Sequence, residues 1–284
     1  MSENVPHSLM NIGDLAKPID SLINRVSDFI GGAFAPHQIK RIAKANAEAA
    51  IIDAQNETYI SEIKVRAAHR IEAEQVRHQR SMEEIVQKST PLLEDKSRPE
   101  DVDNDWLEAF FSHARLVSNE EMQLIWAKIL AGEVNKPGAF SKRTLDLVSK
   151  LSHSEAELFT KLCGYVFDIS GYGHQPLIFS VTDDVYKGNG LGFKEVQLLE
   201  STGLIESHTS GVGLVIHGVH GWLTGQYHER ILKVVIKDVQ ERFPLGKIDF
   251  TNSGRELFLL SGCKPVDGFF EYIQEVWKNW IVTE

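Results

Sequence analysis

Apolar residues recur every three or four positions through residues 12–34 and form one continuous stripe. The stripe consists of Ile12, Leu15, Ile19, Leu22, Val26, Phe29 and Ala33. Polar and charged residues occupy the opposite side, so the segment predicts an amphipathic helix. Pro18 favours two short helical pieces, because proline is best tolerated in a first turn. Gly31, Gly32 and Pro36 are expected to end the segment.

An apolar stripe of this width needs a cover, and three covers are open: the protein's own helices, a partner protein or a membrane surface. The candidate docking residues are Leu15, Ile19, Leu22, Val26 and Phe29, with Lys40, Arg41 and Lys44 placed to assist at lipid headgroups. A solvated helix face is the alternative interpretation of these three basic residues. We favour docking on a partner or lipid over self-packing, because the Gly-Gly-x-x-x-Pro break separates the stripe from the helix that follows.

Residues 37–88 contain neither proline nor glycine and are rich in strong helix formers. A single helix of about 50 residues would be roughly 75 Å long. Its apolar stripe is thin and is carried by Ile60, Ile63, Ala67 and Ile71. A long polar helix of this kind is not stable alone, so we expect it to pair with a copy of itself or with a partner.

The segment that follows, residues 91–105, is rich in proline and charge and is predicted to be a linker. A compact helical block is predicted for residues 106–168. Its first helix begins at an aspartate cap, its second at a capping box formed by Ser118 and Glu121, and its last at Ser152 or Ser154. Leucines and aromatic residues at helical spacing predict a packed core.

Between two of these helices lies "GEVNKPGAFSKRT", residues 132–144, which superficially resembles a phosphate-binding loop. That loop requires Gly, four residues and then Gly-Lys-Ser/Thr after a strand. Here five residues separate Gly132 from Gly138, Ala139 follows, and the preceding element is a predicted helix. We therefore predict a helix–helix connection with Ser141 as the next N-cap.

The C-terminal region, residues 169–284, alternates short predicted strands with helices. Strands are predicted at 176–181, 213–219 and 231–239, and "GFKEVQLLESTGLIES" predicts a helix that runs into a further strand. Together with "IDFTNSGRELF", this order is similar to a winged helix. The predicted class is thus α+β and mainly α, with segments at 1–36, 37–90, 91–105, 106–168 and 169–284.

The charge of the chain and its reactive residues favour few chemistries. Net charge is −10, and residues 153–284 carry 11 basic against 17 acidic side chains, which disfavours nucleic acid as a partner. The two cysteines, Cys163 and Cys263, have no zinc-site spacing and fit a reducing cytoplasm. His217 and His220 are expected to be ordinary polar residues, and "VTDDVYKGNG" an acidic turn. No signal peptide or membrane-spanning run is evident. We expect no catalytic residues, no metal and no cofactor.

Three stretches carry a resemblance to a known family: "IGDLAKPIDSLINRVSDFIGGAFAPHQIKRIAKANAEA", "DVDNDWLEAFFSHARLVSNEEMQLIWAKILAGEVNKPGAFSKRTLDLVSKL" and "FTNSGRELF". They resemble an uncharacterised bacterial family, the domain of unknown function 2806. The chain is also distantly similar to the abortive-infection alpha proteins. The resemblance implies a cytoplasmic bacterial or phage-borne protein with a role in anti-phage defence, and it transfers no catalytic residue.

The expected function is that of a non-enzymatic sensor or adaptor that forms homo-oligomers through residues 37–88. It would bind another protein, such as a defence effector or a phage component, or contact the inner membrane peripherally. The alternative is a winged-helix regulator that binds nucleic acid through residues 193–201. A hydrolase or nuclease is a third class, and it would need converging groups that the sequence does not present.

Overall fold

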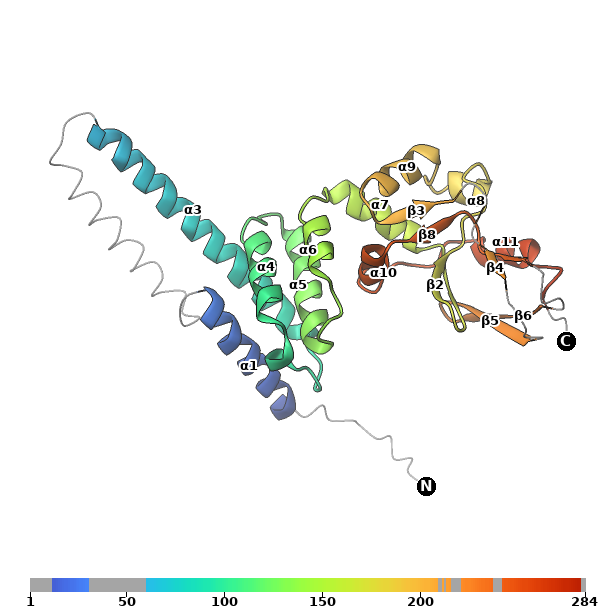
Figure 1. The fold of residues 1–284 in the computed structure, drawn as a ribbon, viewed down its shortest axis with the longest axis horizontal. Helices are drawn as coiled ribbons and strands as arrows, with labels where there is room; N and C mark the ends of the chain where they lie inside the picture. The colour runs from blue at the N-terminus through green and yellow to red at the C-terminus, as the bar shows by residue number, and fades with distance from the viewer. Residues whose placement is uncertain are drawn as a thin grey trace, which may run out of the picture. The chain divides into compact units, whose positions relative to one another are not determined.

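The computed structural model describes residues 12–30, 60–208, 211, 213–215, 221–236 and 242–281. Two compact units divide the chain, Met1–Leu145 and Asp146–Glu284 (Figure 1). The sequence placed a boundary after residue 168 instead. The difference arises because the helix at residues 153–163 belongs with the C-terminal strands: its Phe159 ring lies 5.8 Å from the ring of Phe250.

The first unit is helical. Its elements are α1 (Ile12–Ile30), α3 (Ile60–Ser89), the 3₁₀ turns η1 (Thr90–Leu92) and η2 (Pro99–Asp101), α4 (Asn104–Ala114) and α5 (Glu120–Asn135). A further helix, α6 (Lys142–Val148), begins in this unit and ends in the next. Pro18 lies inside α1, so the two helical pieces predicted from this proline are replaced by one continuous helix.

Local capping explains where α4 and α5 begin. The Asp103 side chain accepts a hydrogen bond from the Trp106 backbone amide at 2.8 Å, as predicted for this helix start. For α5 the predicted cap, Ser118, is wrong by one residue. Asn119 is the N-cap, and its side chain accepts from the Met122 amide at 2.9 Å. An asparagine and a serine are comparable caps, so residue type alone did not separate the two positions.

The core of the first unit is aromatic, as the helical spacing predicted. Trp106, Leu107, Phe110 and Phe111 of α4 are buried, together with Trp126, Ile129 and Leu130 of α5. The Phe110 ring stacks on Trp106 at 5.2 Å and meets Trp126 edge-on at 5.3 Å. These offset and edge-to-face arrangements are the favourable ones for aromatic pairs.

Residues 91–105, predicted to be a linker, are packed onto this core. Leu93, Ser97, Pro99 and Val102 are buried. The Arg98 backbone amide donates to the Val134 carbonyl at 2.9 Å, which ties the segment to α5. Pro91 is the second residue of η1 and Pro99 is the first of η2, positions where the fixed φ angle of proline is tolerated.

The described residues of the second unit form helices and three antiparallel sheets. Its helices are α7 (His153–Cys163), α8 (Asp184–Lys187), α9 (Phe193–Ser201), α10 (Asn252–Phe258) and α11 (Phe269–Val276). Its strands are β1 (Val166–Ile169), β2 (Gly173–Pro176), β3 (Ile205–Ser207), β4 (Gly213–Val215), β5 (Gly221–Tyr227), β6 (Arg230–Ile236), β7 (Arg242–Pro244) and β8 (Ile248–Phe250).

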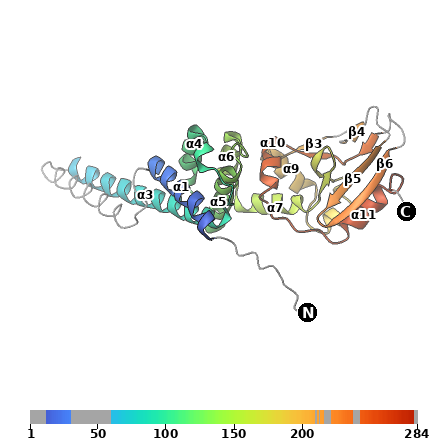
Figure 2. The same cartoon turned by 90° about the horizontal axis from the view of Figure 1, so that it is seen from below.

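The largest of these sheets has the strand order β2-β1-β5-β6, and the others pair β3 with β8 and β4 with β7. Helix α11 lies against the four-stranded sheet (Figure 2). The rings of Phe269 in α11 and of Trp277, the residue that follows α11, lie 6.0 and 5.5 Å from the ring of Phe167 on β1. Rings from a helix and from a strand therefore share one core.

The predicted mixture of helices and strands is confirmed, and the strand positions differ in detail. The strand predicted at 176–181 is wrong: β2 ends at Pro176 and residues 177–181 are not in a strand. Within 213–219 and 231–239, the described residues place strands at 213–215 and 231–236. The helix–strand pair α9–β3 and the strand–helix pair β8–α10 occur as predicted, with Ile205 opposite Phe250 in the β3–β8 pair.

Candidate functional site

The exposed half of α3 is the candidate interaction surface. From Glu62 to Arg80 none of its side chains is buried among the described residues, and the first buried one is Ser81. Ile63 and Ile71 are 53% and 51% exposed, and Ala67, which lies between them on the same face, is partly exposed. The structure therefore places three of the four predicted oligomerisation residues on one accessible face. The fourth, Ile60, starts the helix, and its side chain is not described.

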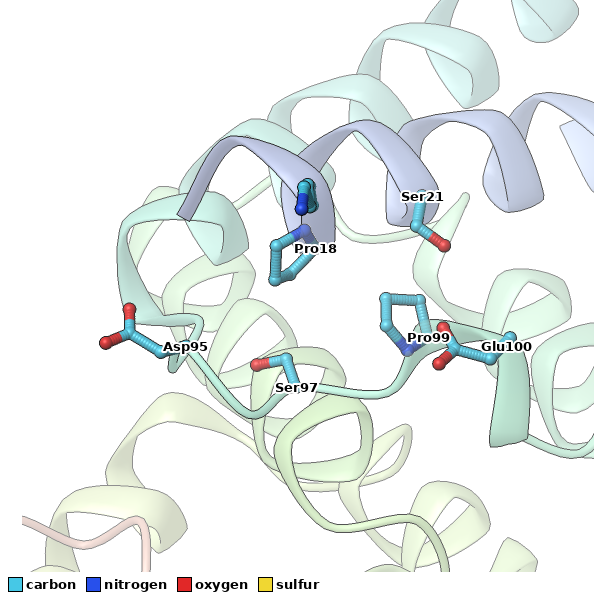
Figure 3. Close-up of a pocket in the computed structure, with 7 residues that line it drawn as sticks. Pro18, Ser21, Asp95, Ser97, Pro99 and Glu100 are labelled. Carbon is cyan, nitrogen blue, oxygen red and sulfur yellow. The ribbon is translucent and has the colours of Figure 1, made fainter. Parts of the chain in front are cut away.

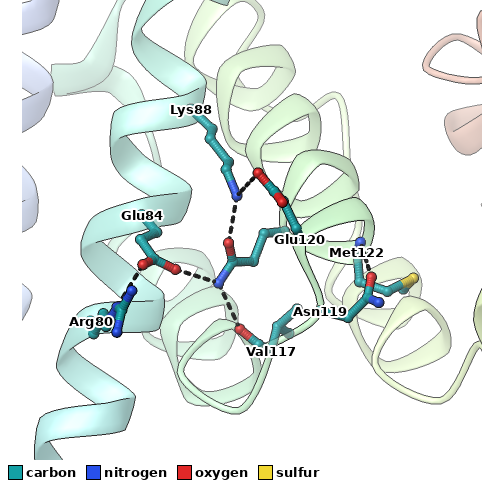
Figure 4. A network of polar contacts seen from close by, with 8 residues as sticks. Arg80, Glu84, Lys88, Val117, Asn119, Glu120 and Met122 are labelled. Atoms are coloured by element: carbon teal, nitrogen blue, oxygen red, sulfur yellow. Dashed lines mark hydrogen bonds and ion pairs between the residues drawn. The ribbon is translucent and has the colours of Figure 1, made fainter.

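The other half of α3 is anchored to α5. Ile85 and Val86 are buried, and a polar network centred on Gln123 joins the two helices (Figure 4). The Gln123 amide nitrogen donates to Glu84 Oε2 at 2.9 Å and to the Val117 carbonyl at 3.1 Å, and its oxygen accepts from Lys88 Nζ at 2.6 Å. Gln123 is buried and uses its oxygen and its nitrogen, as a buried amide requires.

Charge reinforces this network. The hydrogen bond from Arg80 lowers the pKa of the Glu84 carboxyl, and the bond from Gln123 lowers it further, against the opposing effect of burial. Because the pKa of Glu84 is lower in the folded state, its ionised carboxylate stabilises the fold at pH values above the unfolded-state pKa. This contribution is lost as the pH falls through the folded-state pKa. The anchor of α3 is therefore expected to weaken in acid.

Replacing Gln123 with leucine tests the anchor. We expect a loss of about 1 to 3 kcal/mol in the free energy of unfolding, because the Val117 carbonyl, Glu84 and Lys88 each lose a hydrogen bond to the Gln123 side chain. Chemical denaturation of the variant measures this loss. Gln87 is exposed on the same helix α3, so Gln87→Leu is the matched control and should remain near wild type. Equal stabilities of the two variants would contradict an anchoring role.

The predicted docking stripe on α1 is covered at its centre by the protein itself. Leu22 and Val26 are 1% and 0% exposed, and α1 packs against η2 and α4. Arg25 adds two hydrogen bonds from its guanidinium, to the Val102 carbonyl and to Asn104 Oδ1. The structure thus assigns this centre to self-packing, in place of the partner or lipid that we favoured from the Gly-Gly break.

Most of the other residues predicted for docking have side chains outside the described part of the structure. Ile19 is partly exposed, and Leu15 and Phe29 lie in α1 with side chains outside the described set. Lys40, Arg41 and Lys44 lie outside the described residues, as do His217 and His220. Lipid contact through the basic residues stays a prediction.

A hollow of about 490 Å³ lies between α1 and the segment that contains η2 (Figure 3). Lys17, Pro18 and Ser21 line one side, and Asp95, Ser97, Pro99 and Glu100 line the other. The Ser97 hydroxyl is already engaged, because it bonds to Asn135 Oδ1 and accepts from the Glu94 amide at 2.9 Å. Both carboxylates that line the hollow belong to exposed residues. The lining offers no activated nucleophile.

The phosphate-loop question is settled by Glu133, a residue that sequence reasoning overlooked. Its buried carboxylate accepts hydrogen bonds from the Gly138 amide at 2.7 Å and from the Phe140 amide at 2.9 Å. The Trp106 indole nitrogen donates to the Phe140 carbonyl at 2.7 Å. The Glu133 carboxylate thus occupies the backbone amides of this turn. In a nucleotide-binding loop the corresponding amides are free to bind phosphate.

Two other sequence candidates have structural surroundings. In the acidic turn at residues 183–187, Asp183 precedes α8 and its Oδ2 accepts from the Tyr272 hydroxyl at 2.7 Å. On α9, the proposed recognition helix, Lys194 is the single basic residue. The carboxylates of Glu195 and Glu200 bond the Gly192 and Ser207 amides. Both carboxylates are therefore engaged by backbone amides of the protein itself.

Across the described ranges, no three or more His, Cys, Asp or Glu side chains are grouped so that they could hold a metal ion. None of the described helices has both the length and the apolar character needed to cross a bilayer.

Comparison with known families identifies the class of protein that these features belong to. A family model described as "Protein of unknown function (DUF2806)" matches residues 65–274. The chain belongs to this family. The match begins inside α3, so the N-terminal stretch that contributed to the sequence resemblance lies outside it. No curated protein matches the chain, and no solved structure matches it.

Proposed function

We propose that this protein is a non-enzymatic interaction protein that self-associates through the exposed face of α3 formed by Ile63, Ala67 and Ile71. The observation that carries the proposal is the absence of a buried side chain between Glu62 and Arg80 in the described part of α3. Nearly 20 residues of helix, about 30 Å at 1.5 Å per residue, would otherwise rely on weak local stability. Pairing would bury two half-exposed isoleucines per chain.

The attachment of α3 supports the same proposal. Buried Ile85 and Val86 and the Gln123 network hold its C-terminal half on α5. The exposed half therefore extends from a fixed base, which orients its apolar face before any partner arrives. A preorganised helix loses less conformational entropy on association than a free one.

Replacing Ile63 and Ile71 together with aspartate tests this proposal. We expect the molar mass of the full chain, measured by light scattering after size exclusion, to fall to that of a monomer. Like charges on a paired helix face repel, and two apolar contacts per chain are lost. Leu116→Asp is the matched control, since Leu116 is 64% exposed but lies outside α3. A monomeric wild-type chain, or an unchanged mass in the double variant, would refute the proposal.

The biological setting that we propose is anti-phage defence in bacteria. Its support is the similarity of the N-terminal segment, the long helix and the "WAKILAGE" block to abortive-infection alpha proteins. In this setting the assembled α3 helices present the second unit to a defence effector or a phage component. The same variants connect assembly to biology: Ile63→Asp with Ile71→Asp should abolish protection in a plaque assay, whereas Leu116→Asp should retain it.

A further inference from the structure

The fold brings the two cysteines of the chain into one neighbourhood, although they lie far apart in the sequence. Cys163 is the last residue of α7 and is 1% exposed. Cys263 lies in the irregular segment between α10 and α11 and is partly exposed. Both thiols are free.

The residues that follow the two cysteines lie close together in the fold. A Cβ placed on Gly164 would lie 3.0 Å from the Lys264 carbonyl oxygen and 3.0 Å from Val266 Cγ2. The Tyr227 hydroxyl joins the same two segments, because it donates to the Gly164 carbonyl at 2.7 Å and accepts from the Val266 amide at 2.6 Å. The chain after Cys163 and the chain after Cys263 are thus held side by side.

Ser261 lies close to both cysteines. Its hydroxyl accepts a hydrogen bond from the Cys263 amide at 3.4 Å, and it lowers the pKa of the Cys163 thiol against the larger effect of burial. Burial raises the pKa of the Cys163 thiol well above its usual value, and the nearby Cys263 raises it further. The Cys163 thiol is therefore protonated and shielded from solvent, whereas the Cys263 thiol is partly exposed and can react first.

We propose that Cys163 and Cys263 form a peroxide-sensitive thiol pair that closes to an intramolecular disulfide and ties the end of α7 to the segment between α10 and α11. Disulfide closure requires Cα atoms within about 7 Å. The close approach of the Gly164 backbone to the Lys264 carbonyl, one residue beyond each cysteine, supports such a distance.

The chemistry proceeds in two steps and consumes one hydrogen peroxide. The Cys263 thiolate attacks a peroxide oxygen, so that an S–O bond forms, the O–O bond breaks, and hydroxide leaves to become water with the thiol proton. The Cys163 sulfur then attacks the sulfenic sulfur. The S–S bond forms, the S–O bond breaks, and the departing hydroxide takes the Cys163 proton as a second water. Two thiols are oxidised, and one peroxide is reduced to two waters.

Intact mass spectrometry of the reduced full chain, treated in the folded state with one equivalent of hydrogen peroxide and then alkylated in denaturant so that every remaining thiol is reachable, tests this proposal. Because the chain has only two cysteines, any intramolecular disulfide must join this pair. We expect a mass decrease of about 2 Da with no alkylation, since both thiol hydrogens are lost. Two alkylated thiols, or chains linked to one another on a non-reducing gel, would overturn it.

Two further measurements separate native proximity from chance pairing. In Cys263→Ser, a substitution at a partly exposed site, we expect no added oxygen and one alkylated thiol, because the buried Cys163 is shielded from peroxide in the folded chain. In urea, closure by the wild-type chain should slow by about tenfold or more, because the fold no longer brings the distant cysteines together. Equal closure rates in folded and urea-unfolded protein would also overturn the proposal.

Discussion

Replacing Leu22 and Val26 together with aspartate is expected to lower the free energy of unfolding of the first unit by several kcal/mol. Both side chains are buried where α1 packs on η2 and α4, so each carboxylate would have to lose its water there. An unpaired buried carboxylate is among the most costly single changes a core can receive. Thermal melting and amide hydrogen exchange across α1 measure the effect.

The size of this loss should depend on pH in a defined direction. Burial favours the neutral acid, so the folded-state pKa of each new aspartate would lie above its unfolded-state value. The damage is then absent below the unfolded-state pKa, about 3.9 for aspartate, grows as pH rises above it, and levels off above the raised folded-state pKa. Asn24→Asp is the matched control, because Asn24 is exposed on the same helix. Unchanged melting and exchange in the double variant would contradict self-packing and would favour a partner protein or a lipid surface as the cover of the stripe.

Replacing Glu133 with alanine is expected to cost about 3 kcal/mol and to loosen the connection at residues 136–140. The carboxylate is 2% exposed and accepts from two backbone amides, and hydrogen bonds to charged groups contribute about 1.5 to 3 kcal/mol each. Without it the buried Phe140 amide has no replacement among these contacts. Chemical denaturation gives the stability, and hydrogen exchange at Gly138 and Phe140 gives the local effect.

Glutamine at the same position separates charge from shape. Glu133→Gln keeps one acceptor oxygen of nearly the same geometry, so its loss should be about half that of the alanine variant. Glu108 is exposed on α4, and Glu108→Ala should leave both readouts near wild type. If Glu133→Ala matched that control, the carboxylate could not be what organises the turn.

Sequence alone determined the features that depend on neighbouring residues. The aspartate cap of α4 was predicted and involves partners three residues apart, and the start of α7 was narrowed to Ser152 or Ser154, of which the structure has Ser152. The aromatic face of α4 is likewise a matter of helical spacing within eleven residues. These interactions act inside one turn of the chain, so a local pattern is enough to predict them. The helical connection at residues 132–144 was predicted for the same reason.

Only the tertiary structure decided which distant groups meet. The apolar stripe that contains Leu22 and Val26 predicts that some surface covers it, but not which one. In the structure, η2 and α4 provide the cover. The pairing of β1 with β5, the role of Glu133 and the proximity of Cys163 to Cys263 also depend on how separate segments pack. Apolar burial is non-directional, so residue spacing limits what each segment can bury, while the packed chain selects its partners.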